Sequence, residues 1–407
     1  MLLAPSSQAT RDATPRRARS SRRWRVPPPL LRDPSAPETL EGERILAEHP
    51  GEAGLLLWQC YRDVRLWADT PPRLRPELFH RPDSPQRRET TEGARLDPEM
   101  LRGVRSLHAA LRGSGDRGAM VSAALCVAAA AERAGAAATA VAYTQLAATA
   151  APAAAAPALA VGRVAARQGH APMAETWLRR TIALARRSGA WECYGSALTE
   201  LGRLREAAER FREARAEYRR AFLLARRHGL HETHGRAVSG LLRIALREGD
   251  DVAAEKYATG ARRAHRRDHP DRGGVLLDVA EVELRHGRHA RARALLREVP
   301  VPADPFEQVR VLTMLVRAAG GTGDRPAVQE AWHRATGLID AFASDADGAR
   351  LLLGLARAGA EVLEDTQADV AASRALLWAT RAEDAALMEE CTTFLARTRL
   401  PPGGEGG

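Results

Sequence analysis

The sequence predicts an all-α solenoid, in which helical hairpins stack one on the next. Hydrophobic residues make up 45% of the 407 residues and aromatic residues only 4%, so Ala, Leu and Val must build most of the core. These residues favour helices that pack closely. Glycine and proline stand singly between Ala-rich runs, as they do between helices. The chain also resembles itself at intervals of about forty residues, which is typical of a repeat array.

The N-terminal part of the chain comes before the repeats. Residues 1–38 hold eight arginines and only two aspartates, with many Pro and Ser, and we expect a disordered basic tail or a mis-assigned start of translation. A transit peptide or an arm for nucleic acid are the alternatives. Residues 39–80 are expected to form a helical cap and residues 81–100 a polar linker.

The predicted cap contains one strongly amphipathic run, EAGLLLWQCYRDVRLWAD. Its helical period places Leu57, Tyr61, Val64 and Trp67 on one face. We expect Trp67 and the neighbouring Trp58 to seal the first repeat rather than to bind a ligand.

Two segments show the repeat most clearly: PALAVGRVAARQGHAPMAETWLRRTIALARRSG and SALTELGRLREAAERFREARAEYRRAFLLARRHG. Gly162 aligns with Gly202 and Ala174 with Ala214, and the large side chain of Tyr218 follows Ala214 by one turn. Small residues where two helices cross let their backbones approach closely, and a large residue one turn later fills the space beside them.

The same frame extends over residues 101–396, which we assign to about seven repeats. The small residue in the second helix of each repeat marks the frame. These residues are Ala140, Ala174, Ala214, Ala254, Ala292, Val328 and Ala372. We expect residues 397–407, which end in PPGGEGG, to be disordered.

The best-matched unit resembles the tetratricopeptide repeat, in a long-repeat bacterial form. The residues that carry this resemblance are Leu201, Gly202, Phe211, Ala214, Tyr218 and Ala221. The resemblance implies a right-handed α-solenoid whose first helices line a concave groove, and it implies binding of proteins or peptides there. The Asn-containing clamp of one subclass is not implied, because this chain has no Asn.

Arginine dominates the positive charge of the chain. The formal net charge is +10, and all of the 61 basic residues except Lys256 are arginine, which together with the absence of Asn indicates a GC-rich, bacterial genome. Seven arginines recur on the first helices and are our candidates for a basic, peptide-binding groove. They are Arg163, Arg167, Arg203, Arg243, Arg247, Arg285 and Arg317.

Three readings of this arginine row stay open. The groove could bind acidic or carboxylate-bearing segments, because guanidinium groups pair well with carboxylates. The arginines could instead pair with local glutamates such as Glu200, Glu206 and Glu248. A nucleic-acid-associated regulator that uses the basic tail and the groove is the third reading.

A second set of arginines recurs in the last turns of the second helices. It comprises Arg186, Arg187, Arg226, Arg227, Arg266 and Arg267. Cations at a helix C-terminus stabilise the carbonyl end of the helix dipole, which explains this set without a ligand.

No catalytic or cofactor motif is present. The sequence lacks phosphate-loop, nucleophile-elbow and zinc-protease motifs, and its four cysteines are far apart, which favours free thiols in a reducing compartment. Seven histidines cluster between His228 and His289, but we interpret them as solvated turn residues rather than as metal ligands. We therefore expect no enzyme activity, no cofactor and no metal.

One uncharged run, from Ala134 to Gly162, is long enough to cross a membrane. It consists mainly of alanine and contains Pro152 and Pro157, so we expect no membrane span. The predicted function is a cytoplasmic protein-binding or peptide-binding scaffold or sensor module, and the sequence leaves its partner and oligomeric state open.

Overall fold

The computed structural model describes residues 39–75, 79, 96–113, 116–265, 271–360, 362 and 365–399. Eighteen helices and no strand are found within these residues. The predicted basic tail (1–38), most of the predicted linker (81–100) and residues 400–407 lie outside them.

Three helices precede the repeats: α1 (Thr39–Glu48), α2 (Glu52–Asp69) and α4 (Pro98–Arg112). Helix α4 begins three residues before the predicted end of the linker because Asp97 caps it. The Asp97 carboxylate accepts hydrogen bonds from the backbone N–H groups of Glu99 (2.9 Å) and Met100 (3.2 Å). Pro98 at the first helical position costs no hydrogen bond there.

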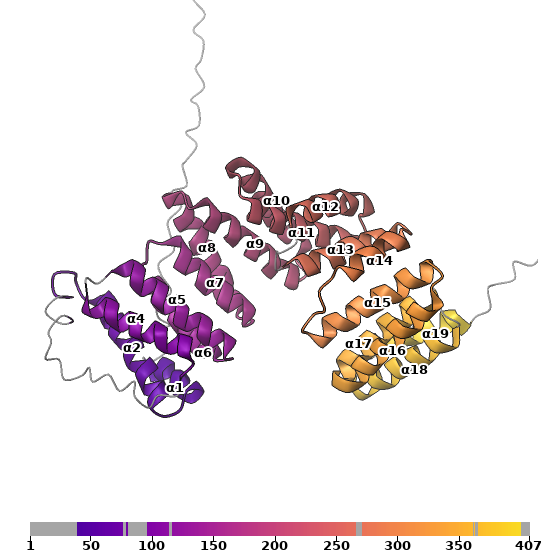
Figure 1. Cartoon of the computed structure of the whole chain (residues 1–407), viewed down its shortest axis with the longest axis horizontal. Coiled ribbons are helices and arrows are strands. Elements are labelled where there is room, and N and C mark those ends of the chain that lie inside the picture. The colour runs from indigo at the N-terminus through magenta and orange to yellow at the C-terminus, as the bar shows by residue number, and fades with distance from the viewer. Residues whose placement is uncertain are drawn as a thin grey trace, which may run out of the picture.

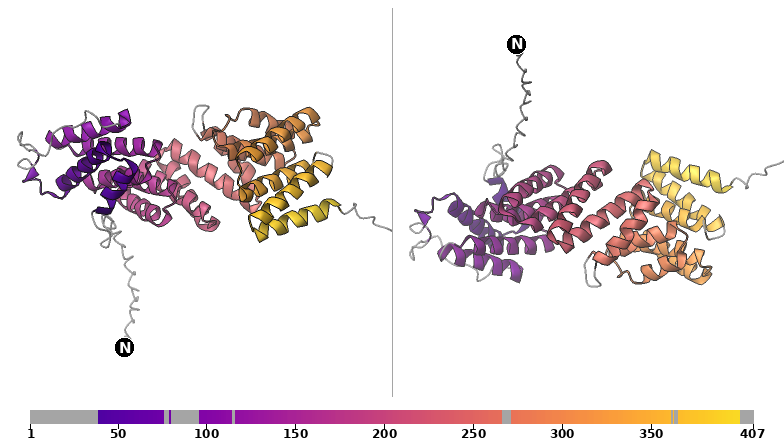
Figure 2. Two further views of the ribbon diagram at one scale, coloured as in Figure 1. Left: turned by 90° about the horizontal axis from the view of Figure 1, so that it is seen from below. Right: turned by 90° about the horizontal axis from the view of Figure 1, so that it is seen from above.

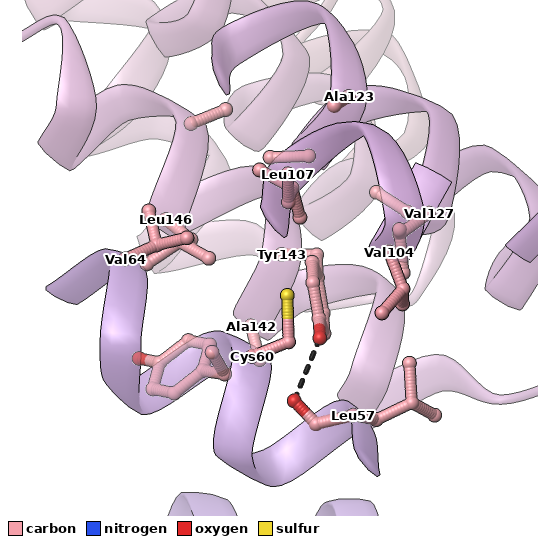
Figure 3. Close-up of a cluster of buried hydrophobic side chains, with 14 of the residues drawn as sticks. Leu57, Cys60, Val64, Val104, Leu107, Ala123, Val127, Ala142, Tyr143 and Leu146 are labelled. Carbon is pink, nitrogen blue, oxygen red and sulfur yellow. Dashed lines mark hydrogen bonds between the residues drawn. The ribbon is translucent and has the colours of Figure 1, made fainter. Parts of the chain in front are cut away.

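Helices α1 and α2 share one hydrophobic core with α4 and the first repeat (Figure 3). Leu57, Tyr61, Val64 and Trp67 are buried on one face of α2, as their spacing predicted. The hydroxyl of Tyr143 donates a hydrogen bond to the backbone oxygen of Leu57 at 2.7 Å, and this bond joins α2 to the first repeat.

A long-range helix cap also joins the N-terminal helices to the repeats. The side chain of Glu48, at the end of α1, accepts hydrogen bonds from the backbone N–H groups of Ala138 (2.7 Å) and Thr139 (2.8 Å). Those two groups belong to the first turn of α6 (Ala137–Ala150), whose own N-cap residue, Ala136, has no side-chain oxygen to offer. Glu48 therefore supplies the missing acceptor from ninety residues away.

Seven helical hairpins follow. They are α5 (Arg117–Arg133) with α6, α7 (Ala155–Arg167) with α8 (Ala171–Ser188), α9 (Trp191–Ala207) with α10 (Phe211–His228), α11 (His231–Glu248) with α12 (Asp251–Ala264), α13 (Arg272–Arg285) with α14 (His289–Arg297), α15 (Pro305–Gly321) with α16 (Arg325–Phe342), and α17 (Asp345–Ala360) with α18 (Asp365–Arg381). Helix α19 (Ala385–Arg399) packs on the last hairpin and extends three residues past the predicted end of the repeats.

The hairpins form an arch with α1 and α19 at opposite ends (Figures 1 and 2). Each first helix from α5 to α17 contacts the first helix of the next hairpin. The second helices are further apart within the described residues. Elements on the inside of a curved stack lie closer together than those on the outside. The first helices therefore line the concave side. The fold is a tetratricopeptide-like α-solenoid, as predicted.

The predicted repeat frame matches the packing of the second helices. The seven marker residues from Ala140 to Ala372 lie one in each second helix, and none is more than 2% exposed. A larger side chain at such a position has no free volume to occupy, so these positions explain why the repeat keeps small residues there.

Tyr218 shows why glycine is needed at two places on the first helices. A Cβ atom at Gly202 of α9 would lie 2.6 Å from the Tyr218 ring, and one at Gly240 of α11 would lie 2.4 Å from it. The ring of Tyr218, which belongs to α10, is therefore clamped between the backbones of the two successive first helices α9 and α11. The repeat frame predicted a small residue at Gly202, but the contact of the Tyr218 ring with either glycine was not predicted.

The uncharged run from Ala134 to Gly162 is divided between two hairpins. Helix α6 has 14 residues and α7 has 13, fewer than the roughly 20 that cross a bilayer. Among the described residues, no helix has the length and apolar composition of a membrane span.

Candidate peptide-binding surface

All seven candidate arginines belong to first helices and therefore to the concave side of the arch. Helix α7 carries Arg163 and Arg167, α11 carries Arg243 and Arg247, and α9, α13 and α15 carry one each. The repeat frame thus predicted correctly that these arginines lie on first helices. The row is not a continuous basic stripe, however, because acidic side chains of neighbouring helices alternate with it.

Two of the ion pairs connect α7 to the helices on either side. Arg163 Nε lies 3.1 Å from Glu200 Oε1 of α9. Arg167 pairs with Glu132 of α5 through two bonds of 2.5 and 2.7 Å. The hydrogen bond with Glu132 raises the pKa of Arg167. Both arginines therefore hold successive first helices together.

The centre of the surface is a partly buried triad of Glu206, Arg243 and Tyr218, in which only Tyr218 is fully buried. Arg243 of α11 binds the Glu206 carboxylate of α9 in a bidentate manner, at 2.8 and 2.9 Å. The hydroxyl of Tyr218 donates to the same carboxylate at 2.8 Å and accepts from Arg243 at 3.2 Å. All three groups are thus satisfied by one another.

The electrostatics of the triad favour its charged state. Burial would raise the pKa of Glu206, but the hydrogen bond and charge of Arg243, the Tyr218 hydrogen bond and the nearby charge of Arg247 lower it overall. Burial raises the pKa of Tyr218, against the charge of Arg243. The tyrosine therefore stays protonated and donates, while the glutamate stays ionised and accepts.

The distal candidates are also paired. Arg317 of α15 lies 3.0 Å from Glu281 of α13, and Arg285 contacts the same glutamate at 3.2 Å. Arg285 further approaches Asp251 at 3.5 Å. The reading in which the arginines pair with glutamates of the chain therefore describes Arg163, Arg167, Arg243, Arg285 and Arg317. Of the glutamates it named, Glu200 and Glu206 are used in this way, whereas Glu248 pairs with Arg215 of α10.

Arg203 and Arg247 differ from the other five. The side chain of Arg203 is 67% exposed, and its contact with Glu200 is a long 3.4 Å. Arg247 is exposed and has no ion pair of 4 Å or less with another described residue. Arg203 and Arg247 act electrostatically on Tyr218 and Glu206, respectively, so the two arginines lie near the triad.

Sequence reasoning missed Asp278, a buried acid that continues the charged row. It lies on α13, 5% exposed, and Arg310 of α15 approaches it at 3.5 Å. Burial raises the pKa of Asp278 to about 6, against the opposing charges of Arg243 and Arg310. The signal in the sequence was an acid, Asp278, in the middle of the otherwise apolar stretch VLLDVA.

Nucleophilic and metal-binding chemistry is not favoured in the described residues. Burial raises the pKa of the thiols of Cys60 (to about 12), Cys193 and Cys391, whereas a nucleophilic cysteine needs a lowered pKa. No group of three or more His, Cys, Asp or Glu side chains there is arranged to hold a metal ion. His269, Arg266 and Arg267 lie outside the described residues.

Comparisons with known proteins give only structural likenesses. No family model and no curated protein matches the sequence. Aspartyl phosphate phosphatase F from Bacillus subtilis is 9% identical, with a TM-score of 0.46 over 91% of this chain and 97% of that one. A Rap protein complexed with competence and sporulation factor is 12% identical, with a TM-score of 0.43 over 86% and 99%. Pseudomonas aeruginosa PilF is 17% identical, with a TM-score of 0.45 over 56% and 95%.

Proposed function

We propose that this protein is a non-enzymatic scaffold that binds a carboxylate-bearing segment of a partner protein on its concave surface, centred on α9 and α11. The observation that carries the proposal is the pair of exposed arginines, Arg203 and Arg247, beside the rigid triad of Glu206, Arg243 and Tyr218. The four free cysteines support a reducing compartment, the bacterial cytoplasm.

The triad prepares the surface for binding. Its members are held by four hydrogen bonds of 2.8–3.2 Å, so they lose little freedom when a ligand arrives. Because Arg243 is neutralised by Glu206 and Arg203 has only its long 3.4 Å contact with Glu200, the least compensated positive charge at the centre belongs to Arg203 and Arg247. A carboxylate between α9 and α11 could accept from both guanidinium groups.

This division of roles argues for a protein ligand rather than a nucleic acid. Nucleic-acid binding draws most of its affinity from many cation–phosphate contacts along the surface. Here six of the seven candidate arginines already pair with carboxylates of the chain, Arg203 only through its 3.4 Å contact. Two exposed arginines suit a discrete acidic contact within a larger interface.

The test is a comparison of two charge-reversed variants in partner capture from the native cell, read by mass spectrometry. R203E/R247E should lose the partners that the wild type retains. The control, R187E/R227E, changes the charge equally at exposed C-terminal ends of α8 and α10 and should keep them. Capture of the same set by R203E/R247E contradicts the proposal. Capture that disappears on nuclease treatment would identify nucleic acid as the ligand.

A further inference from the structure

A groove lies between α12, α13 and the start of α14. It has a volume of about 520 Å³, within the range of roughly 300–1,000 Å³ that is typical of ligand sites. Ala258 of α12 with Val279 and Val282 of α13 form its floor, and each of these apolar residues is no more than 6% exposed. None of the residues that line this groove is one of the seven candidate arginines of the concave surface.

The walls of the groove carry more positive than negative charge. Four arginines and two glutamates line it. Arg288 is neutralised from both sides, since it pairs with Glu283 and, at 2.8 Å, with Glu255. No ion pair within the described residues neutralises Arg262, Arg263 or Arg291, although all three are exposed along the same groove.

The spacing along α12 sets the size of the ligand. Glu255 and Arg263 are eight residues apart, which corresponds to about 12 Å of helix. An extended peptide covers that length with about four residues. Arg262 and Arg263 stand in the last turn of α12, one turn beyond the apolar floor, and Arg291 stands opposite on α14.

We propose that this groove binds a short acidic segment of a protein, with an aliphatic side chain on the Ala258–Val279–Val282 floor and carboxylates on Arg262, Arg263 and Arg291. Charge complementarity selects an acidic occupant, and the length of the groove along α12, about 12 Å from Glu255 to Arg263, suits a peptide rather than a small free anion. The site uses none of the seven candidate arginines of the concave surface, so one chain could hold two partner segments at once.

The experiment measures binding of a fluorescein-labelled peptide of two Glu-Asp-Leu-Glu-Asp repeats to the full chain, by fluorescence anisotropy. The wild type should bind it saturably, one peptide per chain. The variant R262Q/R291Q should bind at least about tenfold more weakly, because it removes two charged hydrogen-bond donors. The control R187Q/R227Q should bind as the wild type does.

A second variant separates the groove from general charge attraction. Thr259 lines the groove with an exposed side chain, so T259W fills it without changing the charge. Binding should again fall at least about tenfold, while R203E/R247E, which tests the concave surface, should leave it unchanged. Circular dichroism melts confirm that each variant is folded.

Three results would overturn the proposal. The first is no saturable binding to the wild type. The second is unchanged binding to both T259W and R262Q/R291Q. The third is displacement of the peptide by inorganic phosphate at equal concentration, which would indicate a site for simple anions. Since the concave variant is measured in parallel, failure here leaves the proposed function on α9 and α11 standing.

Discussion

Tyr218 connects the packing of the array to the chemistry of its concave surface. Its ring is clamped by the backbones of α9 and α11 at Gly202 and Gly240, and its hydroxyl reaches Glu206 and Arg243. The position of the triad therefore depends on how closely two first helices approach. Substitutions at the glycines should change stability even though they touch no charged group.

Gly240→Ala should destabilise the fold by about 1–3 kcal/mol, because the new methyl group would overlap a ring that is clamped on its other side. Urea unfolding measures the change. Gly337→Ala is the matched control: this glycine lies inside α16 with no atom near its would-be Cβ, so alanine there should stabilise by about 0.5–1 kcal/mol. Equal stability of the two variants would show that Tyr218 is not clamped.

Asp278 should make stability depend on pH. Burial raises its pKa to about 6, above the value of 3.8 of a free aspartate, so the folded chain binds this proton more tightly than the unfolded chain. The stability it contributes is complete below about pH 4 and is lost as the pH rises to 6 and above. Asp278→Asn cannot ionise and should avoid this loss.

The measurement for Asp278 is the difference in unfolding free energy between Asp278→Asn and the wild type, at pH 4.5 and pH 7.5. The two-unit shift corresponds to at most about 3 kcal/mol, at about 1.4 kcal/mol per unit. The difference should move in favour of the variant as the pH rises. A difference that stays constant with pH would mean that Asp278 titrates as an ordinary surface acid.

At the scale of elements, the sequence predicts what repeats within each unit. The second-helix markers from Ala140 to Ala372 and the aligned glycines Gly162 and Gly202 recur at intervals of about forty residues, so one alignment reveals them. The first-helix arginines were located by the same interval. Which arginine each of Glu200, Glu206 and Glu281 meets was not predicted, because the paired residues lie 36 or 37 positions apart and only the stacking of the hairpins brings them together.

The same reasoning explains why the Glu48 cap was not predicted. The need for a cap is visible in the sequence, because α6 begins with alanines that cannot accept a hydrogen bond. The residue that provides the acceptor, Glu48, lies ninety positions earlier in the sequence. No local sequence pattern specifies the path of the chain between Glu48 and α6. Only the docking of α1 against α6 reveals the partner.

Glu48→Ala should cost about 0.5–2 kcal/mol, the usual range for a lost helix cap. Hydrogen exchange at the amides of Ala138 and Thr139 should speed up selectively, because both lose their acceptor. Glu43→Ala, an exposed site on the same helix, is the control and should be nearly neutral. Unchanged exchange at α6 would place the cap elsewhere.

At the scale of the whole molecule, ion pairs join α5 to α7, α7 to α9, α9 to α11 and α13 to α15 among the first helices. Each connects a hairpin to its neighbour, in addition to the apolar contacts that stack them. Arg243→Gln should lower the unfolding free energy by about 1–3 kcal/mol, because it leaves the Glu206 carboxylate without its bidentate partner. Urea unfolding tests this, and a fully stable variant would contradict a structural role for Arg243.

The central claim is that the concave arginines divide into structural ones and the two that bind a ligand. Partner capture by the neutral variant R203Q/R247Q tests it most directly, in a sample whose urea midpoint equals that of the wild type. The account predicts that the partners captured by the wild type are lost although stability is unchanged. Retention of those partners by the folded variant would contradict it.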